Sequence, residues 1–137
     1  MGRVMTGLLI LLAIATIGFG YVRLAPSDPA FWHKMPEIST DKDFKQGAIR
    51  VVNAGADGLA RLNLIATATA RTEVLAGSVD AGMITYITRT RVIGFPDYTT
   101  VKQDGDQLKI YARLRFGRSD LGVNRDRIEG WIAALQP

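Results

Sequence analysis

The pattern of hydrophobic and polar residues divides the chain into two unlike parts. Residues 4–22 form an uncharged, largely apolar run between Arg3 and Arg23. At about 1.5 Å of rise per residue, a helix of this length approaches the hydrocarbon thickness of a bilayer. A helix from a soluble core would carry a polar stripe, and this run offers only two threonines. We therefore predict a single transmembrane signal-anchor helix over residues 1–23.

A cleaved secretory signal is the alternative interpretation of this segment. Ala13-Ile14-Ala15 has the small-x-small form that signal peptidase reads. Cleavage there would leave an unusually short hydrophobic region. The apolar run continues past Ala15 to Val22, which favours an uncleaved anchor.

The charges that flank the anchor are nearly balanced. Arg3 and the free amino terminus lie on one side, and Arg23, Lys34 and Asp28 lie on the other. A very short N-terminal tail before an export-type hydrophobic segment usually stays in the cytoplasm. We therefore expect a single-pass protein of the bacterial inner membrane, with its soluble domain in the periplasm.

Residues 24–36 predict a short tether between the anchor and the domain. Three prolines in this stretch favour extended or turned backbone, so the membrane helix cannot continue far into it. Phe31 and Trp32 lie within the tether. We expect these aromatic side chains in the headgroup region or against the domain, and not on a ligand.

Residues 37–137 carry the patterns of a globular domain. Runs of β-branched or alternating apolar residues predict strands, and apolar stripes at helical spacing predict helices, with Trp131 in the core. The last strands are joined by short connections, which implies antiparallel neighbours. The predicted fold class is α+β, with the N-terminal transmembrane helix followed by a small antiparallel sheet covered by two helices. The predicted strands cover residues 48–52, 72–77, 83–93, 98–102 and 108–116, the predicted helices cover residues 56–68 and 124–135, and residues 41–45 are expected to be irregular.

The composition removes several kinds of chemistry. The chain has no cysteine and one histidine, His33 in the tether, so it offers no thiolate and few metal ligands. The net charge of +4 falls to about +2 without the anchor and tether, which is too low to argue for nucleic-acid binding. No carboxylate pair stands out, and there is no glycine-rich phosphate loop or Gly-x-Ser-x-Gly elbow. We therefore predict no catalytic residue, no metal, no cofactor and no nucleic-acid partner.

Arginines are the densest chemical feature of the domain. Period two places two arginines on one face of each of two strands, so strands that face each other in register would form a basic patch. Such a patch suits an anionic lipid headgroup, a phosphate or an acidic partner surface. Solvated outer-face charge is the plainer interpretation, and pairing with Asp97, Asp120 and Asp126 would make the cluster structural. The candidate patch comprises Arg89, Arg91, Arg113, Arg115, Arg118 and Arg125, with Arg127 nearby in sequence.

Two segments of the domain carry a family resemblance. Residues 117–125 read Gly-Arg-Ser-Asp-Leu-Gly-Val-Asn-Arg, and residues 94–98 read Gly-Phe-Pro-Asp-Tyr. The chain from Ala25 to Leu135 resembles the bacterial and plastid domain-of-unknown-function family numbered fourteen ninety-nine. Some members of that family carry an N-terminal export or anchor segment. The resemblance implies no particular activity, cofactor or catalytic residue.

Four polar residues of these segments, Asp97, Ser119, Asp120 and Asn124, form a candidate motif corner. Ser119 or Asp120 can cap the helix that follows, and Asn124 can bond local backbone. We favour a strand-to-helix corner over a ligand site, because each residue has a local structural use.

Three functions follow from these observations. The first is a non-catalytic, membrane-anchored accessory or binding protein that engages an integral membrane protein complex or the bilayer surface. The second is a domain that binds a lipid or a small anion. The third is an enzyme of unknown class, which would need a cleft that brings together Asp97, Asp120, Tyr111 and the arginines.

Overall fold

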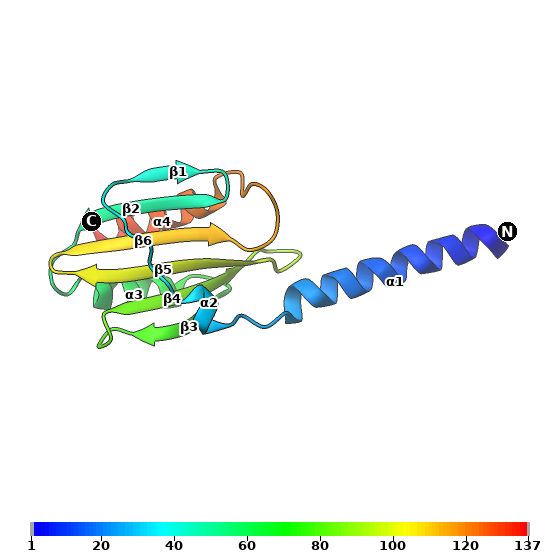
Figure 1. Ribbon diagram of the computed structural model, residues 1–137, viewed down its shortest axis with the longest axis horizontal. Coiled ribbons are helices and arrows are strands. Elements are labelled where there is room, and N and C mark those ends of the chain that lie inside the picture. The colour runs from blue at the N-terminus through cyan, green and yellow to red at the C-terminus, as the bar shows by residue number, and fades with distance from the viewer. Residues whose placement is uncertain (1, 137) are drawn as a thin grey trace.

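The N-terminal helix α1 projects from the rest of the protein (Figure 1). In the computed structural model, which describes residues 2–136, α1 spans Gly2–Leu24 and buries none of its residues. It is the one helix in the described residues that is long and apolar enough to cross a membrane. An N-terminal signal sequence passes the same test. The predicted N-terminal apolar helix is confirmed.

The tether contains a short helix where the sequence predicts extended or turned backbone. This helix, α2, spans Pro29–Trp32. The carboxylate of Asp28 accepts a hydrogen bond from the N–H of Ala30 at 2.9 Å. The expectation is wrong here because Asp28 and Pro29 form a helix start, an N-cap followed by a proline in the first turn.

The domain is built on a six-stranded sheet in the order β1-β2-β6-β5-β4-β3. Every neighbouring pair is antiparallel. The short connections predict this pairing for the last four strands, whereas the first two strands join the sheet through a pair that is distant in sequence. The first strand falls within residues 41–45, which were expected to be irregular, so that expectation is wrong. At three residues the strand is too short to show an alternating pattern. The strands are β1 (Lys42–Phe44), β2 (Gly47–Asn53), β3 (Thr72–Ser78), β4 (Met83–Arg89), β5 (Pro96–Asp104) and β6 (Gln107–Leu114).

Strand β4 ends at Arg89, although the alternating pattern predicts a strand as far as Ile93. The backbone N–H of Thr90 donates to the carbonyl of Phe95 at 3.0 Å. The hydroxyl of Thr90 accepts from the N–H of Phe95 at 2.8 Å. These bonds close a loop between β4 and β5, at whose tip Val92 is 82% exposed.

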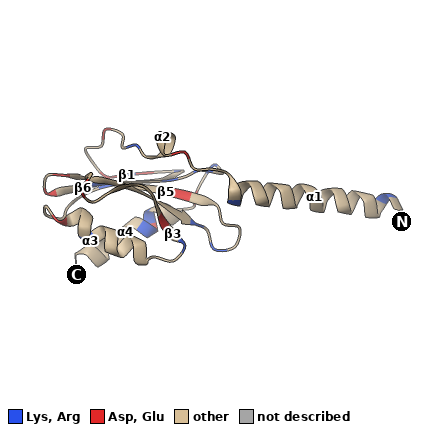
Figure 2. Ribbon diagram, turned by 90° about the horizontal axis from the view of Figure 1, so that it is seen from below, with Lys and Arg blue, Asp and Glu red and all other residues tan. Residues whose placement is uncertain are grey.

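Two helices, α3 (Gly58–Ala68) and α4 (Val123–Leu135), cover one face of the sheet (Figure 2). Trp131 of α4 is 4% exposed and packs edge-on against Tyr86, with ring centroids 5.7 Å apart. The indole N–H of Trp131 donates to the hydroxyl of Thr69, and the hydroxyl of Tyr86 donates to Asn63. The predicted α+β architecture and the core position of Trp131 are therefore confirmed.

The tether and α2 lie over the opposite face of the sheet (Figure 2). The ring of Trp32 stacks on Tyr98 of β5, with centroids 4.0 Å apart and planes 13° from parallel. Ile38, further along this segment, is also buried. The sheet is thus covered on both faces. Helices cover one face, and residues 25–41, which we call the strap, cover the other.

Candidate functional site

The end of the domain nearest α1 is formed by the β4–β5 loop and the β6–α4 loop (Figure 1). Tyr21 in the last turns of α1 meets Phe116 edge-on, with ring centroids 6.0 Å apart. The ring centroid of Phe116 in turn lies 6.3 Å from that of Phe95. Gly94 has a φ of +82°, and a Cβ built on it would lie 3.4 Å from Cζ of Arg23. The last turns of α1 therefore contact this end of the domain, which we call the anchor end.

A cavity of about 330 Å³ opens at the anchor end, and we call it the motif cavity. Its lining is mostly apolar, and it includes the carboxylates of Asp97 and Asp120. Phe95 comes from one of the two segments that carry the family resemblance, and Leu121 comes from the other. The fold therefore brings together two segments that are separated by two strands in the sequence.

Asp97 is the most deeply buried acid of this cavity, at 4% exposure. Its Oδ2 lies 3.3 Å from Nη2 of Arg127, whose other nitrogen Nη1 donates to Asn124 at 2.7 Å. Burial raises the pKa of Asp97, and the positive charge of Arg127 opposes the rise. Burial also lowers the pKa of Arg127. Asp97 and Arg127 are thus a buried pair that fixes α4 to β5.

Asp120 and its neighbours build the turn into α4. The carboxylate of Asp120 accepts hydrogen bonds from the N–H groups of Gly122 at 2.9 Å and Asn124 at 3.0 Å. The hydroxyl of Ser119 accepts from the N–H of Leu121 at 3.2 Å. Both oxygens of Asp120 therefore serve backbone donors of the helix start, which gives the motif corner a structural task.

Two polar side-chain atoms of α4 and β5 are buried without a hydrogen-bond partner in the described part of the chain. They are the amide nitrogen of Asn124 and the hydroxyl of Thr99. Leu121, at the motif corner, has a φ of +54° and is 90% exposed. A left-handed backbone is costly for a residue with a Cβ, so the loop holds an apolar side chain in solvent in a strained conformation.

A second cavity, of about 370 Å³, lies beside the β4–β5 loop and is lined by four arginines. We call it the basic cavity. The side chain of Arg71 donates through Nε to the carbonyl of Arg89 at 3.0 Å, and Arg89 donates through Nη1 to the carbonyl of Gly94 at 3.1 Å. Thr90 lines both this cavity and the motif cavity, so the two are adjacent. The four arginines are Arg23, Arg71, Arg89 and Arg91, and Glu73 is the single acid in the lining.

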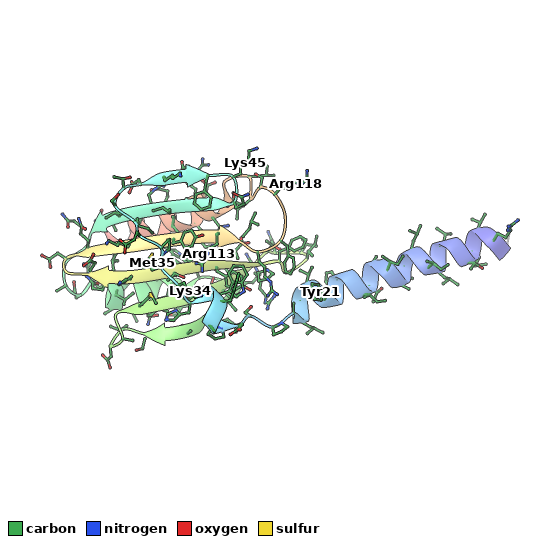
Figure 3. All side chains as sticks on the ribbon, viewed as in Figure 1. Tyr21, Lys34, Met35, Lys45, Arg113 and Arg118 are labelled. Atoms are coloured by element: carbon green, nitrogen blue, oxygen red, sulfur yellow. The ribbon has the colours of Figure 1, made fainter. Side chains whose placement is uncertain are left out.

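The structure does not bring the six candidate arginines into one patch. Strand β5 lies between β4 and β6, so Arg89 and Arg113 are not on neighbouring strands. Arg118 lies on the anchor-end loop, away from Arg113 on the sheet (Figure 3). Arg125 pairs with Asp126 at 3.0 Å.

Arg113 and Arg115 hold the tether on the sheet. Nη2 of Arg113 donates to the carbonyl of Trp32, and Nη1 of Arg115 donates to the carbonyl of Pro26 at 3.0 Å. Cζ of Arg113 also lies 4.4 Å from the ring centroid of Tyr111. Burial lowers the pKa of Arg113 to about 10. These arginines are covered by the chain itself, and Tyr111 is on this face, away from Asp97.

Arg23 and Arg71 are the residues of this end that the sequence reasoning missed. In the sequence, Arg23 was considered only as a charge that borders the anchor, and Arg71 was not proposed as a site residue. The β3–β4 hairpin pairs Thr72 with Thr88, which sets Arg71 beside Arg89. A bulge between Val74 and Ala76 shifts the register of this hairpin, so counting back from its turn would place Arg71 opposite Thr90, and no signal in the sequence sets it beside Arg89. Among residues 2–136, no group of three His, Cys, Asp or Glu side chains could hold a metal ion.

The fold and the site together define a class of protein: an α+β domain strapped at one end to an N-terminal helix that is apolar enough to cross a membrane. The chain belongs to the family described as "Protein of unknown function (DUF1499)", whose model matches residues 22–135. The family inferred from the sequence is thereby confirmed. The match begins in the last turn of α1 and takes in the tether and the whole domain. No match was found among curated proteins or among solved structures.

Proposed function

We propose that this protein is a single-pass, non-catalytic accessory or binding protein of the bacterial inner membrane, with its domain on the periplasmic side. The observation that carries the proposal is the position of the motif cavity at the anchor end. If α1 spans the bilayer, this end of the domain faces the membrane surface. Its partners are then the bilayer itself and an integral membrane protein complex.

The fastening of the tether supports this arrangement. The hydroxyls of Ser27 and Tyr98 are 2.7 Å apart, and Nδ1 of His33 lies 2.8 Å from the hydroxyl of Thr85. With the bonds from Arg113 to the tether, these contacts hold the strap along the sheet. With α1 in the bilayer, these contacts keep the anchor end of the domain at the membrane surface. An accessory protein needs this position to contact a partner in the membrane.

The chemistry of the acids supports binding over catalysis. Asp97 is held by Arg127, and both oxygens of Asp120 accept backbone hydrogen bonds. A general base needs a free carboxylate beside the substrate. The apolar lining of the motif cavity suits an apolar side chain or an acyl chain.

Cysteine labelling tests anchoring and orientation together, because the natural chain has no cysteine. In cells with a permeabilised outer membrane, an impermeant maleimide should label Asp106→Cys, in the β5–β6 turn away from the anchor. Gly2→Cys should be labelled only after the inner membrane is opened. Both variants should resist extraction by alkaline carbonate. Release of the domain, or labelling of Gly2→Cys alone in sealed cells, contradicts the proposal.

A photo-crosslinking pair tests the accessory role. A crosslinker at Leu121, on the motif cavity, is compared with one at Leu64, which is 71% exposed on the outer side of α3. In native membranes, a protein adduct formed from position 121 and not from position 64 supports a membrane partner. Absence of any protein adduct at position 121, with the chain anchored, overturns the accessory role.

A further inference from the structure

We propose that the basic cavity binds the phosphate group of an anionic phospholipid in the membrane that α1 crosses. This assignment rests on the proposed function, because only an anchored domain keeps the cavity at the depth of the headgroups. It adds a ligand class and a binding site.

The charge of the cavity is the first observation. Four guanidinium groups line it against the single carboxylate of Glu73. None of the four arginines takes part in an ion pair within residues 2–136. Planar guanidinium forks match phosphate oxygens, and their excess positive charge favours a lipid with net negative charge. A zwitterionic lipid would bring its own cation toward the same arginines.

The scaffold of the cavity is the second observation. The backbone N–H of Arg89 donates to the carbonyl of Arg71 at 3.0 Å, while the side chain of Arg71 donates to the carbonyl of Arg89. Arg71 has a φ of +56°, a conformation that glycine adopts without strain. An arginine stands there instead, so the strained position delivers a guanidinium to the cavity.

The position of the cavity along the membrane normal is the third observation. Arg23 is the basic residue in the last turn of α1 and lines the cavity. The end of a spanning helix lies at the level of the lipid headgroups. The phosphate of a lipid beside α1 is therefore at the same depth as the cavity.

The apolar neighbours of the cavity are the fourth observation. Val92 and Ile93, in the β4–β5 loop, are 82% and 40% exposed, and Leu24 after Arg23 is 83% exposed. Apolar side chains next to arginines are the composition of surfaces that lie in a membrane interface. We infer that the loop enters the interface while the arginines hold the phosphate.

Lipid selectivity is the direct test. The full-length chain is placed in nanodiscs with equal amounts of phosphatidylglycerol and phosphatidylcholine, and the lipids retained after transfer to mild detergent are identified by native mass spectrometry. The wild-type chain should retain phosphatidylglycerol in preference. Arg23→Gln with Arg91→Gln should lower this preference about tenfold, because charge-assisted bonds to phosphate are lost. These two side chains make no hydrogen bond in the described chain, so folding should persist.

The matched control is Lys42→Gln with Lys102→Gln, which removes two charges from exposed positions on β1 and β5. It should keep the wild-type preference. Equal retention of both lipids by the wild-type chain, or equal loss in the control, overturns the assignment. Inorganic phosphate should not bind the chain in nanodiscs of phosphatidylcholine alone, and it should not displace phosphatidylglycerol from the mixed nanodiscs. Binding in the first together with displacement in the second would overturn the assignment and identify free phosphate as the ligand. If the chain resists carbonate extraction but shows no lipid preference, the lipid-binding inference fails and the proposed function stands. If the chain is extracted by carbonate, both the inference and the proposed function fail.

A spin label gives a measurement that does not depend on the arginine variants. A nitroxide at Val92→Cys in lipid nanodiscs should be exposed to membrane-dissolved oxygen and shielded from an aqueous nickel complex. One at Val79→Cys, which is 39% exposed in the β3–β4 turn, should show the reverse. Water exposure of both labels would overturn the insertion of the β4–β5 loop.

Discussion

Arg127 on one face of the sheet and Arg113 on the other are both largely covered by the fold, and they are held in different ways. On the helix-covered face, the side chain of Arg127 is 11% exposed and lies 3.3 Å from the carboxylate of Asp97. On the strap-covered face, Arg113 is 7% exposed and has no ion-pair partner within residues 2–136. Its nitrogens donate to the hydroxyl of Thr100 and the carbonyl of Trp32.

The difference shows which parts of the fold depend on each other. Asp97 belongs to the sheet, so the partner of Arg127 is present whenever β5 is formed. One acceptor of Arg113 belongs to the tether, so satisfying Arg113 and ordering the strap occur together. We therefore expect changes on the helix face to affect global stability, and changes on the strap face to affect the tether first.

The largest effect is expected from Arg127→Met. It leaves the carboxylate of Asp97 buried without a counter-charge, and breaking a buried pair in this way costs about 3–5 kcal/mol. Urea unfolding of the full chain in detergent at neutral pH measures the loss. A loss below about 1 kcal/mol would show that the pair contributes little to the fold.

The same variant has a predicted pH dependence. Burial raises the pKa of Asp97 in the folded protein above that of an ordinary carboxyl group. Protonated Asp97 therefore stabilises the folded state fully at a pH below the ordinary pKa, and this stabilisation is lost as the pH rises through the raised pKa. Removing Arg127 removes the charge that opposes the rise. The destabilisation should therefore be greatest near pH 7 and smaller near about pH 4. Asp97→Asn combined with Arg127→Met should remove the difference between the two pH values.

Arg113→Met should cost less, about 2 kcal/mol, because it leaves neutral acceptors unpaired and not a charge. Its specific effect should be on the strap. Hydrogen exchange of residues 26–36 should become faster, while exchange in α3 and α4 stays slow. Equal acceleration in the helices would contradict the separation of the two faces.

Ser27→Ala should cost about 1 kcal/mol, since it removes one hydrogen bond, the 2.7 Å contact with the hydroxyl of Tyr98. The strap keeps its other contacts, so exchange should rise only around Pro26 and Asp28. Thermal unfolding with exchange mass spectrometry gives both values. Full release of the strap by this change would show that Arg113 is not its main fastening.

The smallest effect is expected from Leu121→Gly, which lies on neither face. Glycine relieves the left-handed backbone, and the side chain that is lost is 90% exposed. Stability should rise by about 0.5 kcal/mol or less, as the more flexible unfolded chain offsets part of the relief. A clear destabilisation would mean that Leu121 makes contacts that this structure does not contain.

Elements with long periodic patterns were predictable from the sequence, and short ones were not. The alternation in β6 and the apolar stripe of α4 gave the right element types with small errors at the ends. The edge strand β1 is too short to show a period. In α2, the prolines that suggested an extended tether are compatible with a helix because Pro29 occupies the first turn after Asp28.

The candidate site was less predictable because it depends on strand order and register. The sequence predicted Arg113 and Arg115 on one face of a strand, but β6 ends at Leu114, so only Arg113 lies within it. The sequence also could not show that β5 separates β6 from β4. A bulge between Val74 and Ala76 shifts the register of the β3–β4 hairpin, so counting back from its turn does not set Arg71 opposite Arg89. The basic cavity also needs Arg23 from α1, which only tertiary packing brings close.

The strap also sets how far the domain can travel. Folded along the sheet, it keeps the anchor end beside α1; peeled away, residues 25–41 would extend to roughly 55 Å. Its contacts lie in series along the chain, so tension on α1 would load those near Pro26 first and reach those near Ile38 last. Force on α1 would therefore break the strap contacts one after another, and the strap would lengthen before the force reached the sheet.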